Sequence, residues 1–262
     1  MPGKDVSGVF PGEVMVTAAA REIHDGEVVF VGMRLPLIAF QLAKFTHAPG
    51  AVGVFENGIV RETPSSEFLL TMGDPPNVVG ASMCTRMPVA MALLGRGRVD
   101  LGFIGGAEVD RFGNVNSSYI GSRSHPRVKL PGSGGACDIA SLAGRLLVIM
   151  SHERHRLCEK VDYVTSPGFL RGRAQRLAAG LPGGGPSALI TTLAVFEFDA
   201  QSGEAVLRSH HPGTSIERIR EQTGWPLRVS PDVRETPTPT AEELSIIRRL
   251  DPKGFWTRQA VA

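Results

Sequence analysis

A glutamate stands at the end of an apolar segment of this chain. Residues 51–60 read AVGVFENGIV, so Glu56 follows Val, Gly and Phe and directly precedes Asn57 and Gly58. Burying an unpaired carboxylate is costly, so a carboxylate at the end of an apolar strand usually caps, pairs or reacts. The alternative is a solvated glutamate beside an Asn-Gly turn. This segment alone leaves both interpretations open.

Two glycine-rich segments could bind an anion through backbone amides. The segment FIGGAEVDRFGNVNSS at 103–118 places Gly105 and Gly106 at a strand end, where open α/β sheets bind their ligands. In the same segment Asn114 and Asn116 could donate amide hydrogen bonds. The segment LPGSGGACD at 130–138 offers consecutive amides ahead of an expected helix, those of Ser133, Gly134, Gly135 and Ala136. It lacks the spacing of a Walker loop or a dinucleotide fingerprint, so a simple loop is the alternative.

A basic cluster precedes the second glycine-rich segment and consists of Arg123, Arg127 and Lys129. Three cations beside exposed amides would suit an anionic ligand. The alternative is a solvated loop.

The histidines and cysteines give little support for a metal site. SHERHRLCEK at 151–160 contains His152, His155 and Cys158, but the spacing is not HExxH and no second ligand pair is apparent. We therefore expect a solvated helix face with Cys158 buried, and no metal. Cys137 has no histidine tied to it by sequence, so we expect a small packed thiol.

The composition is that of an ordinary globular protein. The 262 residues are 42% hydrophobic and 21% charged, which suffices for one α/β domain. A net charge of +2 does not favour nucleic acid or a membrane surface as a partner. The N-terminus lacks an apolar signal region, and no apolar run approaches the roughly 18 residues of a membrane span. Three scattered cysteines fit a reducing cytoplasm.

Helical and strand patterns alternate in the first third of the chain, which is typical of a parallel sheet covered on both faces. The expected helices lie at 13–25, 36–47 and 88–96, and the expected strands at 27–32, 51–56, 77–82 and 99–109. After a turn at 110–113, a loop-rich region runs to about residue 144. Beyond it we expect strands at 145–152 and 161–168, a hairpin within 188–213, a helix with Thr214 as N-cap, and a last short helix.

Five motifs in one order carry a resemblance to a known family. They are MRLPLI at 33–38, VFENGIV at 54–60, FIGGAEVDRFGNVNSSYIG at 103–121, HPRVKLPGSGGACDIA at 125–140 and KVDYVTSPGFL at 160–170. Together they resemble the B (beta) chain of the glutaconate-type class I CoA-transferases over roughly residues 13–252.

The resemblance implies an open, mostly parallel α/β sheet with flanking helices, of the CoA-transferase (NagB/RpiA-like) type. It also implies pairing with a CoA-transferase A (alpha) subunit. We expect a single domain over 1–262, with an N-terminal extension at 1–12 and a connector and helix at 233–262.

The resemblance also implies that Glu56 is the covalent nucleophile. Its carboxylate would attack an acyl-CoA thioester, pass through an anhydride and a glutamyl-CoA thioester, and return CoA to a second acid by ping-pong chemistry. CoA thioesters and carboxylic acids, glutaconate-like dicarboxylates among them, are then substrates, and no cofactor is permanently bound. Candidates for oxyanion or CoA binding are Asn57, Gly105, Gly106, Ser133, Gly134, Gly135 and Ala136; candidates for anion binding are Arg123, Arg127 and Lys129.

Two alternatives stay open. Relatives that lack this glutamate decarboxylate or hydrolyse acyl-CoA thioesters, so the presence of Glu56 favours transfer over those reactions. A non-catalytic chain that only binds CoA or its partner is the alternative of another class.

Overall fold

The computed structural model describes residues 8–65 and 67–258, which divide into two compact units. Unit 1 comprises the chain up to Phe103 and from Pro237 onward, and unit 2 comprises Ile104–Thr236. The sequence predicts one domain, and within it the structure has these two units. Of the expected N-terminal extension, residues 1–7 lie outside the described residues, and Pro11 already begins a helix.

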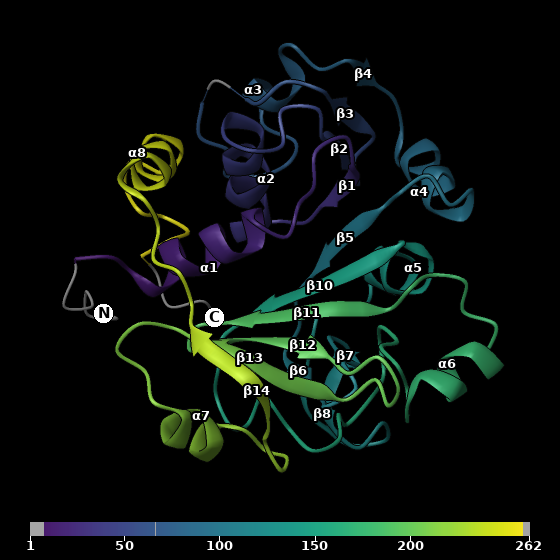
Figure 1. The fold of residues 1–262 in the computed structure, drawn as a ribbon. Helices are drawn as coiled ribbons and strands as arrows, with labels where there is room; N and C mark the ends of the chain where they lie inside the picture. The colour runs from purple at the N-terminus through teal and green to yellow at the C-terminus, as the bar shows by residue number, and fades with distance from the viewer. Residues whose placement is uncertain (1–7, 66, 259–262) are drawn as a thin grey trace. The chain divides into compact units, whose positions relative to one another are not determined.

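Unit 1 contains sheet strands in the order β5-β1-β2-β3-β4. The strands are β1 (Val28–Val31), β2 (Val52–Phe55), β3 (Ile59–Arg61), β4 (Met83–Cys84) and β5 (Leu101–Ile104). Strand β1 pairs in parallel with β2 and β5, whereas β3 and β4 add antiparallel pairs. The helices are α1 (Pro11–Ala20), α2 (Leu35–Phe45), α3 (Pro75–Val78), α4 (Met87–Gly95) and α8 (Ala241–Leu250) (Figure 1).

Helix α2 fixes the position of β2. Phe40 of α2 packs edge-on against Phe55, the last residue of β2, with ring centroids 6.3 Å apart. A Cβ on Gly53 would lie 2.6 Å from the Phe40 ring, so only glycine allows this close approach. The strand therefore ends at a position held by aromatic packing, one residue before Glu56.

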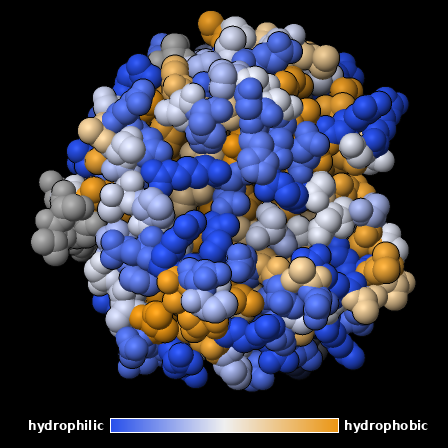
Figure 2. Space-filling model, in the orientation of Figure 1, coloured by the Kyte–Doolittle hydropathy of each residue, from blue (hydrophilic) through white to orange (hydrophobic). Residues whose placement is uncertain are grey.

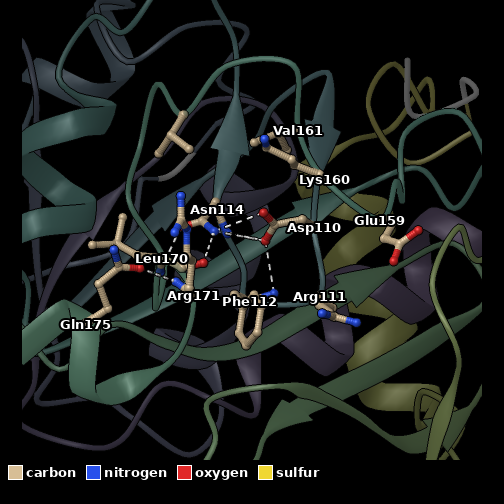
Figure 3. A pocket seen from close by; sticks show the side chains of 11 residues that line it. Asp110, Arg111, Phe112, Asn114, Glu159, Lys160, Val161, Leu170, Arg171 and Gln175 are labelled. Atoms are coloured by element: carbon tan, nitrogen blue, oxygen red, sulfur yellow. Dashed lines mark hydrogen bonds between the residues drawn. The ribbon is translucent and has the colours of Figure 1, made fainter.

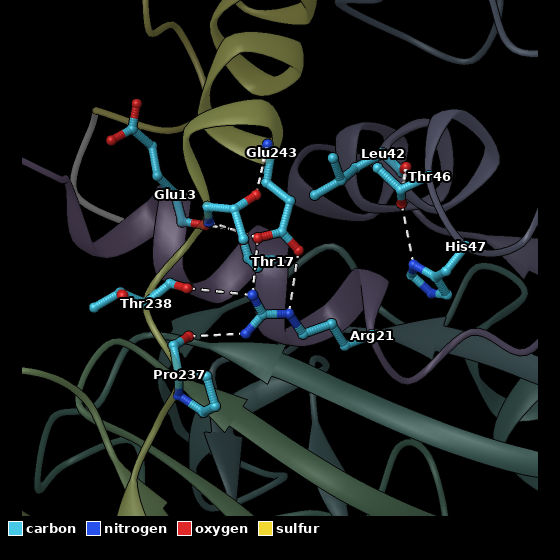
Figure 4. A network of polar contacts seen from close by, with 10 residues as sticks. Glu13, Thr17, Arg21, Leu42, Thr46, His47, Pro237, Thr238 and Glu243 are labelled. Carbon is cyan, nitrogen blue, oxygen red and sulfur yellow. Dashed lines mark hydrogen bonds and ion pairs between the residues drawn. The ribbon is translucent and has the colours of Figure 1, made fainter.

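Charged side chains link helix α8 to the end of α1. Arg21, which follows α1, donates to both carboxylate oxygens of Glu243 and to the carbonyls of Pro237 and Thr238, at 2.8 to 3.2 Å. Figure 4 shows the guanidinium lying between these partners. The chain from Pro237 to α8 thus belongs to unit 1 through specific contacts, whereas residues 233–235 of the expected connector are the end of strand β14 in unit 2.

A second pair between α1 and α8 is expected to contribute more to stability. Glu13 is fully buried, and Arg248 Nε donates to it at 2.8 Å. We expect Arg248→Ala to lower the free energy of unfolding by about 1–3 kcal/mol, because it leaves a buried carboxylate short of a donor. Arg249→Ala on the same helix is the matched control. Among the described residues Arg249 stacks on Phe45 and makes no ion pair, so its loss should lower the free energy of unfolding by less than about 1 kcal/mol. Urea denaturation measures both, and equal effects would contradict the assignment.

Unit 2 contains strands in the order β14-β13-β12-β11-β10. They are β10 (Arg145–Met150), β11 (Pro186–Thr191), β12 (Ala194–Phe198), β13 (Ala205–His210) and β14 (Arg228–Glu235). The pairs β10–β11 and β13–β14 are parallel, and β12 is antiparallel to both of its neighbours. Two small sheets are formed by β6 (Glu108–Val109) with β7 (Val115–Asn116), and by β8 (Tyr119–Gly121) with β9 (Pro126–Lys129). The helices are α5 (Ala136–Leu142), α6 (Arg173–Ala178) and α7 (Ile216–Gln222).

The predicted fold, an open, mostly parallel α/β sheet with flanking helices, is confirmed, with antiparallel pairs added in both units. The first two helices, the strands of β1 and β2, the β12–β13 hairpin and the last helix lie close to their predicted positions. In the described part of the chain, no helix is long and apolar enough to span a membrane.

Several local predictions are wrong. The segment 77–82 is not a strand, because Pro75 and Pro76 begin helix α3. No strand covers 161–168, where Ser166 makes only an isolated bridge to Val115. The expected strand at 99–109 is broken after Ile104, and the N-cap of α7 is Ser215, whose hydroxyl accepts the amide of Arg218.

The surface view in Figure 2 shows a face of mostly hydrophilic residues with hydrophobic residues in separate patches. In unit 1, large exposed apolar side chains lie around β4, and they include Val78, Val79, Met83, Met87 and Val89. Exposed apolar residues close together are typical of surfaces that contact another chain.

Candidate active site

Glu56 lies at the tip of the β2–β3 hairpin. Phe55 ends β2, Ile59 begins β3, and the amide of Gly58 donates to the carbonyl of Phe55 at 2.9 Å. Gly58 has a φ of +98°, so Glu56 and Asn57 form a tight turn that closes on a glycine with positive φ. The side chain of Glu56 is half-buried. The glutamate therefore occupies a rigid turn at the carboxyl end of a parallel strand.

The carboxyl end of β2 is the edge at which open α/β sheets bind ligands. Because β1 runs parallel to β2, Val31 ends its strand at the same edge. At this edge Arg34 has a φ of +69°, a conformation that is uncommon outside glycine and often found at functional sites. Its guanidinium lies 5.0 Å from the centre of the Trp256 ring.

The side chain of Asn57 is engaged within unit 1. Its Nδ2 donates to the carbonyl of Met72 at 3.0 Å, and its Oδ1 accepts the amide of Ile59 at 3.3 Å. The sequence predicts Asn57 as an oxyanion or CoA ligand. The geometry shows an anchor between the Glu56 turn and the loop that carries Met72, a loop whose importance the sequence does not indicate.

The predicted glycine donors all lie in unit 2. Gly105 directly follows β5 and is exposed, and a Cβ on Gly106 would lie 2.3 Å from Val115. In the second segment the Ala136 amide already donates to the Ser133 carbonyl, and the Cys137 amide to the Ser133 hydroxyl. These internal bonds start helix α5. They remove Ala136 from the strongest candidates.

The basic cluster lies on the β8–β9 hairpin. Arg127 and Lys129 lie on β9, where the pairing with β8 skips Arg127 at a register shift, and Arg123 lies in the turn before the strand. All three side chains are exposed. The hairpin therefore presents cations to solvent, as either interpretation of the cluster requires.

The predicted amide donors Asn114 and Asn116 are also used internally. Asn114 donates to Asp110 and to the carbonyl of Leu170, and Asn116 donates to Glu108 and to the carbonyl of Tyr119. Their amides therefore brace the loops of unit 2.

Unit 2 has a cavity of about 680 Å³ beside these loops. It is lined in part by Asp110, Asn114 and Leu170, with Arg111, Lys160 and Arg171 as its cations (Figure 3). Burial raises the pKa of Asp110 to about 6, against hydrogen bonds from Asn114 that lower it. Asn114 also accepts the amide of Leu170, whose φ is +60°. Sequence analysis missed the cavity because loops far apart in sequence form it.

The segment 151–160 differs from its prediction. It is not a helix, and His152 is buried, with Nδ1 at 2.9 Å from the Thr191 hydroxyl and Nε2 at 3.2 Å from that of Thr223. His155 is exposed beside Glu153. Cys158 is half-buried, and burial raises the pKa of its thiol to about 12. Among the described residues, no group of three His, Cys, Asp or Glu side chains could hold a metal ion.

Two buried histidines are expected to make stability depend on pH. Burial lowers the pKa of His152 to about 3 and that of His211 to about 4, from 6.5. As pH falls below about 6.5, these histidines therefore take up protons in the unfolded state before they do so in the folded state. For each histidine the free energy of unfolding falls by about 1.4 kcal/mol per pH unit, until the pH reaches the pKa of that histidine in the folded state. Between about pH 6 and pH 4, Asp110 has the opposite effect and raises the free energy of unfolding as pH falls, because its pKa is higher in the folded state than in the unfolded state.

The difference between the wild type and the double variant His152→Gln/His211→Gln isolates the histidine contribution. We expect urea denaturation between pH 7 and pH 4.5 to show a steeper loss of stability in the wild type. Parallel pH profiles would show that these histidines are not held neutral.

Known proteins resemble this chain over nearly its whole length. The family described as Coenzyme A transferase matches residues 13–222. The B chain of the 3-oxoadipate CoA-transferase of Pseudomonas knackmussii is 39% identical over 95% of each chain. The B chain of the glutaconate CoA-transferase of Acidaminococcus fermentans is 36% identical over 92% of each chain.

Solved structures agree with these similarities. The crystal structure of the Acidaminococcus fermentans enzyme matches with a TM-score of 0.88 over 95% of this chain and 97% of that one. The decarboxylase AibA/AibB also matches, with a TM-score of 0.83 and 31% identity over 97% of this chain and 100% of that one. The extent of these matches, together with the family match, shows that this chain belongs to the coenzyme A transferase family.

Proposed function

We propose that this chain is the B (beta) component of a heteromeric CoA-transferase that moves CoA between carboxylic acids through a glutamyl-CoA thioester on Glu56. The observation that carries the proposal is the position of Glu56, on a rigid turn at the carboxyl end of a parallel strand. The similar enzymes, in which the matching chain is one component of a heteromer, support an A-type subunit as the partner.

The proposed chemistry uses the carboxylate as a nucleophile in two successive acyl transfers. A Glu56 oxygen attacks the thioester carbonyl, the C–S bond of the resulting adduct breaks, and CoA leaves as thiolate while a mixed anhydride of the acyl group with Glu56 forms. The thiolate then attacks the glutamyl carbonyl, and the donor acid leaves as carboxylate. The acceptor carboxylate repeats these steps in reverse, so that the thioester is conserved and protons balance throughout.

The oxyanion of each tetrahedral intermediate needs hydrogen-bond donors. Gly105, Gly106, Ser133, Gly134 and Gly135 remain the proposed sources of backbone amides. The exposed cations Arg123, Arg127 and Lys129 remain proposed contacts for an anionic part of the ligand. These assignments rest on the sequence. The exposure of Gly105, Gly134 and the three cations supports them, whereas Gly106 and Ser133 are half-buried and Gly135 is buried.

We propose a dicarboxylate as one of the two acids. The names of the similar enzymes contain 3-oxoadipate and glutaconate, and both compounds carry two carboxylates. A short acyl-CoA is the proposed second substrate.

Decarboxylation of an acyl-CoA is the second candidate, and the similarity to the decarboxylase AibA/AibB favours it. In that reaction Glu56 would act as a base or stabilise charge, and no acceptor acid would be consumed. Hydrolysis of the thioester would also proceed without an acceptor.

The two candidates are separated by product analysis on the chain purified with its A-type partner. We expect acetyl-CoA or succinyl-CoA to yield a new CoA thioester only when 3-oxoadipate or glutaconate is added, with free CoA released at a far lower rate. Release of carbon dioxide or of stoichiometric free CoA without an acceptor would instead establish decarboxylation or hydrolysis.

A further inference from the structure

The carbonyl oxygen of Met72 joins the candidate nucleophile's turn to a buried asparagine. It accepts the Nδ2 of Asn57 at 3.0 Å and the Nδ2 of Asn77 at 2.7 Å. A carbonyl has two lone pairs, so it can accept both amides. Asn57 directly follows Glu56, and a shift of this carbonyl would therefore move the turn that carries the glutamate.

Asn77 is an unusual residue for its position. It has no exposed surface, and its Oδ1 has no hydrogen-bond partner among the described residues. An unsatisfied buried oxygen carries a free-energy penalty, and such a group in a folded protein calls for an explanation beyond stability. Among the described residues, the Asn77 side chain makes one hydrogen bond, from its Nδ2 to the Met72 carbonyl.

Helix α3, which holds Asn77, and the residues on either side of it are themselves held in place. Arg61 on β3 is buried, and its Nη1 donates to the carbonyls of Pro76, Asn77 and Val79 at 2.6 to 3.1 Å. Asp74 accepts the amides of Leu70 and Thr71 just before α3, together with the Thr71 hydroxyl. Because the backbone of Asn77 is held in place, its side-chain amide can hold the Met72 carbonyl in place.

We propose that Asn77 is a positioning residue for Glu56, which acts through the Met72 carbonyl and Asn57 to hold the nucleophile's turn in its reactive geometry. This inference rests on the proposed function. Asn77 does not contact the reacting atoms. Its contribution is to the orientation of the carboxylate, and small errors in such an orientation cost large factors in rate.

Two variants test the link. Asn77→Ala removes the donor and the unpartnered oxygen together, while Met72 keeps Asn57 as its donor, so the fold should lose little stability. Asn77→Asp keeps the size but presents a carboxylate oxygen to the Met72 carbonyl, which repels it. We expect kcat for CoA transfer by the complex with the A-type partner to fall at least about tenfold in both, with the KM for acyl-CoA within about twofold.

The matched control is Thr63→Ala. The Thr63 hydroxyl donates to the carbonyl of Gly80, which follows α3, at 3.3 Å. Thr63 is exposed and makes no hydrogen bond to Met72. Its kcat should stay within about twofold of the wild type. Asn57→Ala breaks the same link from the other end, and the Asn57/Asn77 double variant should be little worse than either single variant, because both act through one carbonyl.

The outcomes separate this inference from the proposed function. If the wild-type complex transfers CoA and forms a covalent adduct on Glu56, and Asn77→Ala has the same kcat as the wild type, then the positioning role alone is overturned. A collapse of the melting temperature of Asn77→Ala also overturns it, because the residue is then structural, and additive losses in the double variant do the same. If the wild-type complex transfers CoA without forming a covalent adduct on Glu56, the proposed nucleophile is wrong, and Asn77 then has no nucleophile to position.

Discussion

Glu56→Gln is expected to reduce CoA transfer by at least about a thousandfold, because the amide keeps the size of the side chain but is a very poor nucleophile. Steady-state assays of the complex with the A-type partner measure the loss. The Glu56 turn is fixed by backbone and by Asn57, so the variant should fold and assemble like the wild type.

The matched control is Glu62→Gln, at an exposed glutamate just beyond the same hairpin. It should transfer CoA at the wild-type rate. Full activity in Glu56→Gln would favour a non-catalytic role for this chain, and retained decarboxylation or hydrolysis without transfer would favour the second candidate function.

Gly58→Ala is expected to have the largest effect on stability among single methyl additions near the site. Gly58 has a φ of +98°, and a Cβ there would lie 2.6 Å from the backbone of Thr85 and 2.7 Å from that of Arg86. Both the left-handed conformation and the backbone clash oppose the substitution. We expect a loss of about 2–4 kcal/mol in unfolding free energy, measured by urea denaturation, and a matching loss of transfer activity.

Gly73→Ala serves as the control, because it lies on the nearby loop and an added Cβ would meet nothing closer than 3.7 Å. It should change stability by less than about 1 kcal/mol. Equal effects of the two substitutions would show that the Glu56 turn tolerates adjustment and is not rigid.

Local patterns predicted the part of the site that is contiguous in sequence. An apolar run, a glutamate and Asn-Gly correctly indicated a strand end followed by a tight turn at Glu56. The alternation of helices and strands predicted the α/β class, because each element carries its own periodicity. The motif resemblance then predicted the family, which the similarities confirm.

What depends on tertiary contacts could not be predicted. Nothing local distinguishes Arg61 from a solvated strand-end cation, yet in the structure it is buried and holds carbonyls up to Val79. His152 suggested an exposed helix face and is instead buried against Thr191, 39 residues away. Val78 and Val79 suggested a strand because they are β-branched, but two prolines before them begin a helix.

The glycine segments illustrate the same limit within unit 2. Consecutive small residues predicted a row of available amides, but whether an amide is available depends on its neighbours. The Ser133 carbonyl takes the Ala136 amide as helix α5 begins. The sequence can propose candidate amide donors, but the hydrogen bonds in the structure decide which of those amides are already used.

The most direct test of the proposed nucleophile is peptide mass spectrometry. The chain, purified with its A-type partner, is exposed to acyl-CoA without acceptor and then reduced with borohydride. We expect the Glu56 peptide to lose the mass that corresponds to reduction of its carboxyl to an alcohol, with no such change in the Glu62 peptide. An unmodified Glu56 in a complex that still consumes acyl-CoA would contradict the proposed nucleophile.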